Sequence, residues 1–285
     1  MTDDLTKRVQ ASFTDRTDER LMELLVPLVQ HLHDYAREVD LKFDEWEYAI
    51  DFLTRTGQQC DDVRQEFVLL SDVLGLSTLI EQLDSASHPE ATASTVLGPF
   101  HLVASPARRM REDISAAVPG SRALVRGRVI DTQGRPVAGA QVDVWQSDAD
   151  GNYDVQREPD QIGVGRGLFT AGEDGSFEFV TVRPSKYPVP TDGPVGQLLG
   201  ATGRHPYRPA HIHFQVTAPG HLSLTTHVFD ADSEYLDTDT VFAATPELEE
   251  SFVPVDDPQL AGQLGIANPF QSVEVELVLA VEGDA

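Results

Sequence analysis

Two histidines, His211 and His213, lie two residues apart in the apolar segment RPAHIHF. Alternating side chains around them predict a β-strand, in which residues i and i+2 point to the same face. Two imidazoles on one face can bind a transition metal. They can equally be half-buried strand residues whose ring nitrogens bond to backbone groups. The spacing alone leaves both interpretations open, so the remaining candidate ligands have to decide.

Two tyrosines upstream could complete a metal site. Tyr153 follows a strand pattern and a glycine-containing turn, and Tyr187 lies in the proline-rich loop RPSKYPVPTDGP, where a side chain can be aimed. A free phenol has a pKa of about 10, so holding a phenolate at neutral pH needs a strong Lewis acid. Fe(III) is such an acid, and tyrosinate is a known iron ligand. Each tyrosine by itself is equally compatible with ordinary packing, its hydroxyl at the surface.

The elements that position these residues lie in the C-terminal part of the chain, where the spacing of the apolar residues differs from that in the N-terminal part. Residues 1–86 carry apolar side chains at three- and four-residue spacing, which predicts helices. From about residue 121 the period becomes two, and turns rich in Gly and Pro separate short alternating segments. Many strands without intervening helices predict an antiparallel sandwich or barrel.

We therefore expect a mostly β protein with some α-helix. An antiparallel β-sandwich catalytic domain over residues 106–285 follows an N-terminal helical region over residues 1–105. The sequence leaves open whether the helices form a domain of their own or pack on the sandwich.

Composition narrows the function classes. The chain has 285 residues, with 47 acidic and 21 basic side chains and a net charge of −26. A field of that sign repels nucleic acid and anionic lipid, so we expect no binding to nucleic acid or membrane. The single cysteine, Cys60, excludes an intrachain disulfide and any metal site that needs two cysteines of one chain. With no recognisable signal peptide and no long apolar run, the sequence predicts a cytoplasmic protein.

The segments that carry these residues resemble the intradiol ring-cleaving dioxygenases, the catechol 1,2-dioxygenase group. The resemblance rests on DVWQSDADGNYD, YPVPTDGPVGQLLGATGRHPYRPAHIHF, LTTHVF and TVLGPFH, and it runs through nearly the whole chain. It implies one non-haem Fe(III) per chain, bound by Tyr153, Tyr187, His211 and His213. It also implies that Tyr187 leaves the metal when substrate binds and acts as a base, while Arg208 stabilises negative charge on the ring or peroxide.

The resemblance further implies a substrate class. The reaction would be intradiol cleavage of an aromatic diol or triol by O2, giving a cis,cis-muconate. EYLDTDTVF, residues 234–242, resembles family members that cleave hydroxyquinol, benzene-1,2,4-triol. The positions that line the substrate pocket in those members match Leu69, Asp72, Val96, Leu97, Gly98 and Val241. His227 stands where many catechol enzymes have glutamine, and we expect it to contact the substrate.

Two of these pocket positions bear on the choice of ring. Asp72 lies three residues after Leu69 on one helix, so both can line one pocket, and a buried carboxylate could accept the third hydroxyl of hydroxyquinol. A helix-surface acid is an equally good interpretation of Asp72. Leu97 replaces the phenylalanine expected there, which leaves room for a bulkier or halogenated ring. Catechol and chlorocatechol therefore remain alternative substrates.

Other functions and partners stay open. GRVIDTQGRPVAGAQVDVW by itself resembles the transthyretin-like repeats of non-catalytic binding modules, which lack the four-ligand set. His211 and His213 could instead carry zinc in a metallohydrolase, which would lack the colour of an Fe(III)–tyrosinate site. The family resemblance also implies a homodimer formed through the N-terminal helices, with a phospholipid bound between them.

Overall fold

The computed structural model describes residues 2–61, 64–102, 105–157 and 161–283. The chain divides into two compact units, Met1–Gln58 and Gln59–Ala285. Within the described ranges, no helix is both long and apolar enough to cross a membrane. The domain boundary expected at residue 105 stays a prediction about folding units.

The first unit is helical, as its apolar periodicity predicts. It contains α1 (Thr2–Ala11), α2 (Glu19–Glu38) and α3 (Phe43–Gln58). The side chain of Asp18 caps α2 by accepting from the backbone N–H of Leu21, which satisfies a donor that the first helical turn leaves open. No residue of α2 is buried. Its apolar stripe is therefore exposed; the stripe consists of Leu21, Leu24, Leu28, Leu32 and Tyr35.

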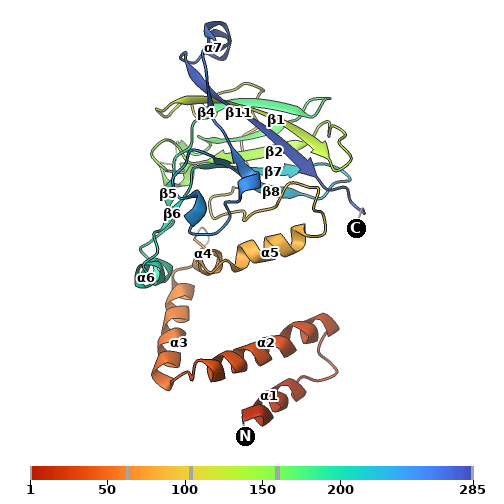
Figure 1. The fold of residues 1–285 in the computed structure, drawn as a ribbon, viewed down its shortest axis with the longest axis vertical. Helices are drawn as coiled ribbons and strands as arrows, with labels where there is room; N and C mark the ends of the chain where they lie inside the picture. The colour runs from red at the N-terminus through yellow and green to blue at the C-terminus, as the bar shows by residue number, and fades with distance from the viewer. Residues whose placement is uncertain (1, 62–63, 103–104, 158–160, 284–285) are drawn as a thin grey trace. The chain divides into compact units, whose positions relative to one another are not determined.

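The second unit combines short helices with a β-sandwich (Figure 1). The helices are α4 (Glu66–Val73), α5 (Leu76–Ser85), α6 (Pro194–Ala201) and α7 (Pro258–Leu264), with 3₁₀ turns at Asp154–Gln156, Leu236–Thr238 and Pro246–Leu248. The strands are β1 (Arg122–Asp131), β2 (Gln141–Gln146), β3 (Arg166–Thr170), β4 (Ser176–Val182), β5 (Tyr187–Pro188), β6 (Tyr207–Arg208), β7 (His211–Thr217), β8 (Leu224–Asp230), β9 (Glu249–Glu250), β10 (Val253–Val255) and β11 (Phe270–Leu279).

Two sheets face each other, which confirms the predicted sandwich. One has the strand order β10-β11-β1-β4 and the other β3-β2-β7-β8-β9, while β5 and β6 form a separate two-stranded pair. Most neighbours run antiparallel, as expected, but β1 pairs with β11 in parallel and so does β8 with β9. Parallel neighbours need a long connection, and nearly all of the sandwich lies between β1 and β11 in the chain.

The alternation of side chains separates the core from the site. On β7, Ile212 and Phe214 enter the core between the sheets, where they meet side chains of β1, such as Val125. The residues between them, His211 and His213, therefore face the other side of the five-stranded sheet. On that side lie α4 and α5, and the buried residues of α4 pack against Phe229 and its neighbours (Figure 1).

Several elements were not predicted from periodicity. Strand β3 is only five residues long, and α6 and α7 have eight and seven residues. Each helix begins with proline at its first turn, and α7 is capped by the side chain of Asp257. Elements this short present less than two periods of a helical or strand pattern, so tertiary contacts define them.

A substitution at Gly127 can test how tightly the four-stranded sheet is packed. Gly127 pairs with Phe177 across β1 and β4, and a Cβ at Gly127 would lie 1.9 Å from the Phe177 ring. Gly127→Ala should lower the free energy of unfolding by about 1–3 kcal/mol, because the buried ring has to leave its rotamer. Denaturant unfolding measures this. Gly262→Ala on α7 is the control: a Cβ there meets nothing within 4 Å, so stability should be unchanged or slightly higher. Equal stability of the two variants would contradict this packing.

Candidate active site

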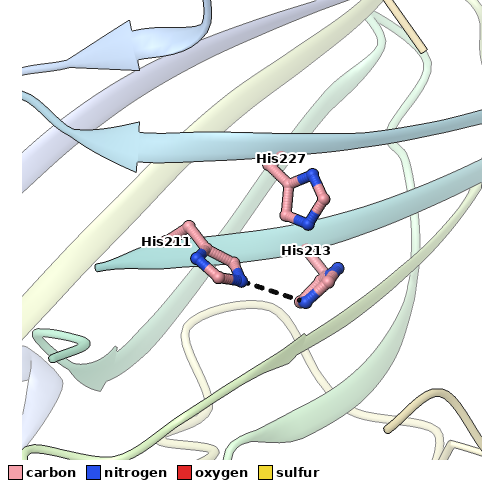
Figure 2. A group of neighbouring side chains, drawn as sticks. All are labelled: His211, His213 and His227. Atoms are coloured by element: carbon pink, nitrogen blue, oxygen red, sulfur yellow. Dashed lines mark hydrogen bonds between the residues drawn. The ribbon is translucent and has the colours of Figure 1, made fainter. Parts of the chain in front are cut away.

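Three adjacent strands place aromatic side chains in one row. The register of β2, β7 and β8 sets Trp145 beside His213 and His213 beside His227. The Trp145 indole stacks on His213 with ring centroids 4.7 Å apart, and the centroids of His213 and His227 are 4.1 Å apart. Figure 2 shows His211 and His213 projecting from β7 toward the same space as His227 from β8. The row results directly from strand periodicity and pairing.

Donor atoms of four predicted ligands converge at this row. The Nε2 atoms of His211 and His213 are 3.1 Å apart, and the Tyr153 hydroxyl lies 3.3 Å from His211 Nε2. Tyr187 pairs with Arg208 across β5 and β6, and its hydroxyl lies 3.4 Å from Arg208 Nη1. All five side chains are at most 3% exposed. The structure therefore brings together, in one buried cluster, the residues that the sequence singled out.

The loop that carries Tyr153 is fixed on both sides. The buried guanidinium of Arg166 donates to both carboxylate oxygens of Asp154, at 2.7 and 3.0 Å, and to the carbonyl oxygen of Phe100 at 2.7 Å. The Phe100 ring stacks on Tyr153 with centroids 4.4 Å apart. On the opposite side of the loop, Gly151 has φ +81°, and a Cβ there would lie 2.8 Å from the backbone oxygen of Lys186. Only glycine fits such a turn without strain.

Burial and charge set the protonation of the donors. Burial, aided by the positive charge of Arg208, holds the pKa of His211 well below its ordinary value. Burial and the neighbouring His211 do the same to the pKa of His213. Both imidazoles are therefore neutral near pH 7 and keep a lone pair for a metal. Burial raises the pKa of Tyr153 well above its ordinary value, and Tyr187 raises it further. Tyr153 therefore needs a bound cation to become a phenolate.

The tautomer of His211 also suits a metal. Its Nδ1 lies 2.7 Å from the carbonyl oxygen of Pro209, which can only accept, so Nδ1 carries the proton and Nε2 is free to bind. Phenolic oxygens and imidazole nitrogens without any thiol are a donor set that suits Fe(III). Ring nitrogens of His211, His213 and His227 lie within 4.8 Å of one another, so these three side chains together could hold a metal ion.

Comparison with known proteins agrees with this geometry. Residues 18–92 match the sequence model for the catechol dioxygenase N terminus, and residues 99–275 match the dioxygenase model. The chain belongs to the intradiol dioxygenase family. The chain is thus an enzyme of the dioxygenase class, and its family implies non-haem iron.

Individual relatives cover almost the whole enzyme. The 6-chlorohydroxyquinol 1,2-dioxygenase of Cupriavidus pinatubonensis is 51% identical over 86% of this chain and 88% of its own length. The hydroxyquinol 1,2-dioxygenase of a Rhizobium species is 46% identical over 95% of this chain and 93% of its own. The crystal structure of the hydroxyquinol 1,2-dioxygenase of Pseudomonas putida superposes with a TM-score of 0.90 at 42% identity, covering 99% of each chain.

A cavity of the dioxygenase adjoins the donor cluster. It is lined by Leu69, Asp72, Val96, Gly98, Pro99, Phe100, Tyr187, Val189, Pro190, Arg208 and Val241. Most of the residues that the sequence assigned to substrate therefore line one cavity next to the donor cluster. Leu97 lies instead in the adjoining outer pocket, which shares Asp72, and is 40% exposed. His227 lies among the imidazoles and Arg208 rather than with the apolar walls.

Asp72 is the one carboxylate among the residues that line that cavity. It is 4% exposed, and its Oδ1 has no hydrogen-bond partner within the described residues. Burial raises its pKa above the ordinary value. A buried hydrogen-bond acceptor without a partner lowers the stability of the fold. A hydroxyl group in the cavity could donate a hydrogen bond to this oxygen.

Sequence reasoning did not single out three residues of the dioxygenase site. Trp145 stacks on His213, Thr95 places its hydroxyl against Nδ1 of His227, and Asp239 binds the Arg208 guanidinium. The contact of Trp145 depends on sheet pairing, and those of Thr95 and Asp239 depend on segments distant in the chain that pack against the site. The pairing of His213 with His227 did have a signal, since both are seven residues from Gly220 at the turn of the hairpin.

The Arg166–Asp154 pair supports a stability prediction. Asp154→Ala should lower the free energy of unfolding by about 3–5 kcal/mol, because it leaves a buried guanidinium without its carboxylate. The exposed Glu173→Ala on the loop before β4 should change it by no more than about 0.5 kcal/mol. Urea unfolding of both variants measures the difference, and similar values would show that the pair does not anchor the Tyr153 loop.

Proposed function

We propose that this dioxygenase cleaves hydroxyquinol between its two adjacent hydroxylated carbons. The carbon–carbon bond breaks, both atoms of O2 enter the product as carboxyl oxygens, and 3-hydroxy-cis,cis-muconate forms and tautomerises to maleylacetate. The observation that carries the proposal is the buried, unpartnered carboxylate oxygen of Asp72 in the cavity beside the donor cluster. The hydroxyquinol enzymes among its relatives support the same substrate.

We propose Tyr153, Tyr187, His211 and His213 as the ligands of one Fe(III) per chain. Two phenolates would neutralise two of the three positive charges of the ion, which suits a buried site. Bound Fe(III) supplies Lewis acidity, which favours a deprotonated diol, and a redox centre for reaction with O2.

The protein's own groups then have defined tasks. A Tyr187 phenolate could accept a proton from a ring hydroxyl, because Tyr187 lines the cavity. Arg208 Nη1 lies 3.3–3.4 Å from His211 and Tyr187, so its charge is held where negative charge develops during the reaction. Leu69, Val96 and Val241 form apolar walls that hold a flat ring and exclude water.

A halogenated ring is the second candidate substrate. The enzyme named for 6-chlorohydroxyquinol is 51% identical to this chain, and Leu97 in the outer pocket leaves room that phenylalanine would fill. Catechol is disfavoured because it lacks the third hydroxyl that would bind Asp72.

We also propose a homodimer formed through the N-terminal helices, with a phospholipid between them. The support is the apolar stripe of α2, whose side chains are 45–58% exposed. Such a stripe is the usual mark of a helix that packs against a partner. The cytoplasmic location stays a prediction.

Metal analysis tests the ligand set. The purified dioxygenase should contain about one iron per chain, and His211→Ala should lose most of it, because a nitrogen ligand is removed from a four-residue set. His221→Ala, in the turn between β7 and β8, is the control and should keep its iron. Full activity in a zinc-loaded, iron-free protein would refute the assignment.

Asp72→Asn tests the substrate. If Asp72 accepts from the third hydroxyl, kcat/KM for hydroxyquinol should fall by the equivalent of about 1–3 kcal/mol, while kcat/KM for catechol should barely change. A preference for hydroxyquinol could also come from its electron-rich ring. In that case the Asp72→Asn variant would keep the preference. Glu81→Gln, in the outer pocket, is the matched control and should leave both values unchanged. Equal losses on both rings would mean that Asp72 supports α4, and a wild-type preference for catechol would overturn the substrate.

A further inference from the structure

We propose that Asp239 is a positioning residue that aims the Arg208 guanidinium into the site and, with the same carboxylate, holds one wall of the cavity. The inference rests on the proposed function, since it assigns Arg208 its task. Asp239 is 3% exposed and Arg208 is 2% exposed. A fully buried charge pair next to a reaction centre can serve stability, geometry or both, so the contacts have to distinguish these roles.

The contact uses one edge of the guanidinium. Nε of Arg208 donates to Oδ1 of Asp239 at 3.2 Å, and Nη2 donates to Oδ2 at 3.4 Å. The remaining nitrogen, Nη1, is the one that lies 3.3 Å from His211 Nε2 and 3.4 Å from both Tyr187 Oη and His227 Nε2. The guanidinium is planar and rigid, so a carboxylate that holds one edge fixes the direction of the third nitrogen.

The same carboxylate organises the next turn of the chain. Oδ1 accepts from the backbone N–H of Val241 at 3.3 Å, and Oδ2 accepts from those of Ala243 and Ala244 at 3.1 and 3.2 Å. Within this turn Phe242 has φ +60°, a conformation that is unfavourable for a bulky side chain. Val241 lines the cavity and is 2% exposed. Asp239 therefore couples the direction of the arginine to the position of one cavity wall.

Charge balance favours the same role. Burial would lower the pKa of the Arg208 guanidinium, but the negative charge of Asp239 and its hydrogen bonds oppose this and keep the group charged. Within the described residues, Asp239 is the carboxylate that forms an ion pair with Arg208. The pair delivers a fixed positive charge to the centre without leaving that charge uncompensated.

Asp239→Asn tests the proposal with the shape of the side chain preserved. The amide introduced by this substitution keeps one oxygen for the backbone N–H groups but loses the charge and one arm of the pair. We expect kcat for hydroxyquinol to fall about 10-fold, with iron content unchanged. The dissociation constant for hydroxyquinol, measured without O2 so that no reaction occurs, should change less than about 3-fold, because the developing charge arises only during reaction.

A double-mutant cycle separates positioning from bulk stability. Arg208→Ala should lower kcat by about 10²–10³ while the protein keeps its iron. If Asp239 acts through Arg208, adding Asp239→Asn to Arg208→Ala should change kcat less than about 2-fold. Losses that multiply would overturn the proposal. If Arg208→Ala fails to fold, Asp239→Glu is measured in place of the cycle, because glutamate keeps the negative charge. A kcat of Asp239→Glu that is closer to wild type than that of Asp239→Asn supports the role of the charge. A lower kcat for Asp239→Glu than for Asp239→Asn contradicts it.

A remote aspartate provides the matched control. Asp131, at the end of β1, also accepts from two backbone N–H groups, of Gln133 and Arg135, and from the Arg135 side chain. Asp131→Asn should lower the melting temperature as Asp239→Asn does but leave kcat at the wild-type value. A similar loss of kcat in both variants would assign Asp239 a structural role. A wild-type, iron-loaded protein that does not cleave hydroxyquinol would refute the proposed function instead, and the cycle would then be measured with the ring that it does cleave.

Discussion

The positive charge of Arg208, buried among imidazoles and phenols, is the interaction on which the site depends. It helps to keep His211, His213 and His227 neutral, because a second positive charge nearby would be repelled in a medium of low dielectric. Neutral imidazoles can bind a metal and protonated ones cannot. The same charge opposes the effect of burial on Tyr153 and so favours its phenolate. One guanidinium thus biases the protonation of these donors toward the metal-binding form.

Different parts of the fold position the imidazoles and the tyrosines. The pairing of β2, β7 and β8 fixes the imidazoles, since a strand that slipped by one residue would turn its histidines into the hydrophobic core. Segments outside the two large sheets carry the tyrosines: Tyr153 lies on a loop that the buried Arg166–Asp154 pair stiffens, and Tyr187 lies on the short strand β5 rather than in the loop that the sequence predicted. Functional side chains on loops that a rigid scaffold positions are a common basis for catalytic sites.

Much of this was accessible from the sequence because it depends on local patterns. The period of two from about residue 121 predicted where the strands begin, since β1 starts at Arg122, and the His211–His213 spacing predicted two imidazoles on one face. The substrate-pocket residues came from family resemblance rather than from periodicity. Asp239 and Thr95 were missed because their importance arises only when a distant segment folds against β6 or β8. The parallel pairing of β1 with β11 was missed for the same reason, because no local signal sets the direction of a strand reached after a long connection.

We propose that phenolates of Tyr153 and Tyr187 bind Fe(III) at this cluster. The visible absorption spectrum of the purified, iron-containing protein tests it most directly, because charge transfer from a phenolate to Fe(III) colours the protein and zinc does not. We expect a visible band that weakens in Tyr153→Phe and in Tyr187→Phe and is unchanged in Tyr235→Phe, whose ring stacks on Tyr207. A colourless protein with full activity, or a band that neither substitution alters, would contradict it.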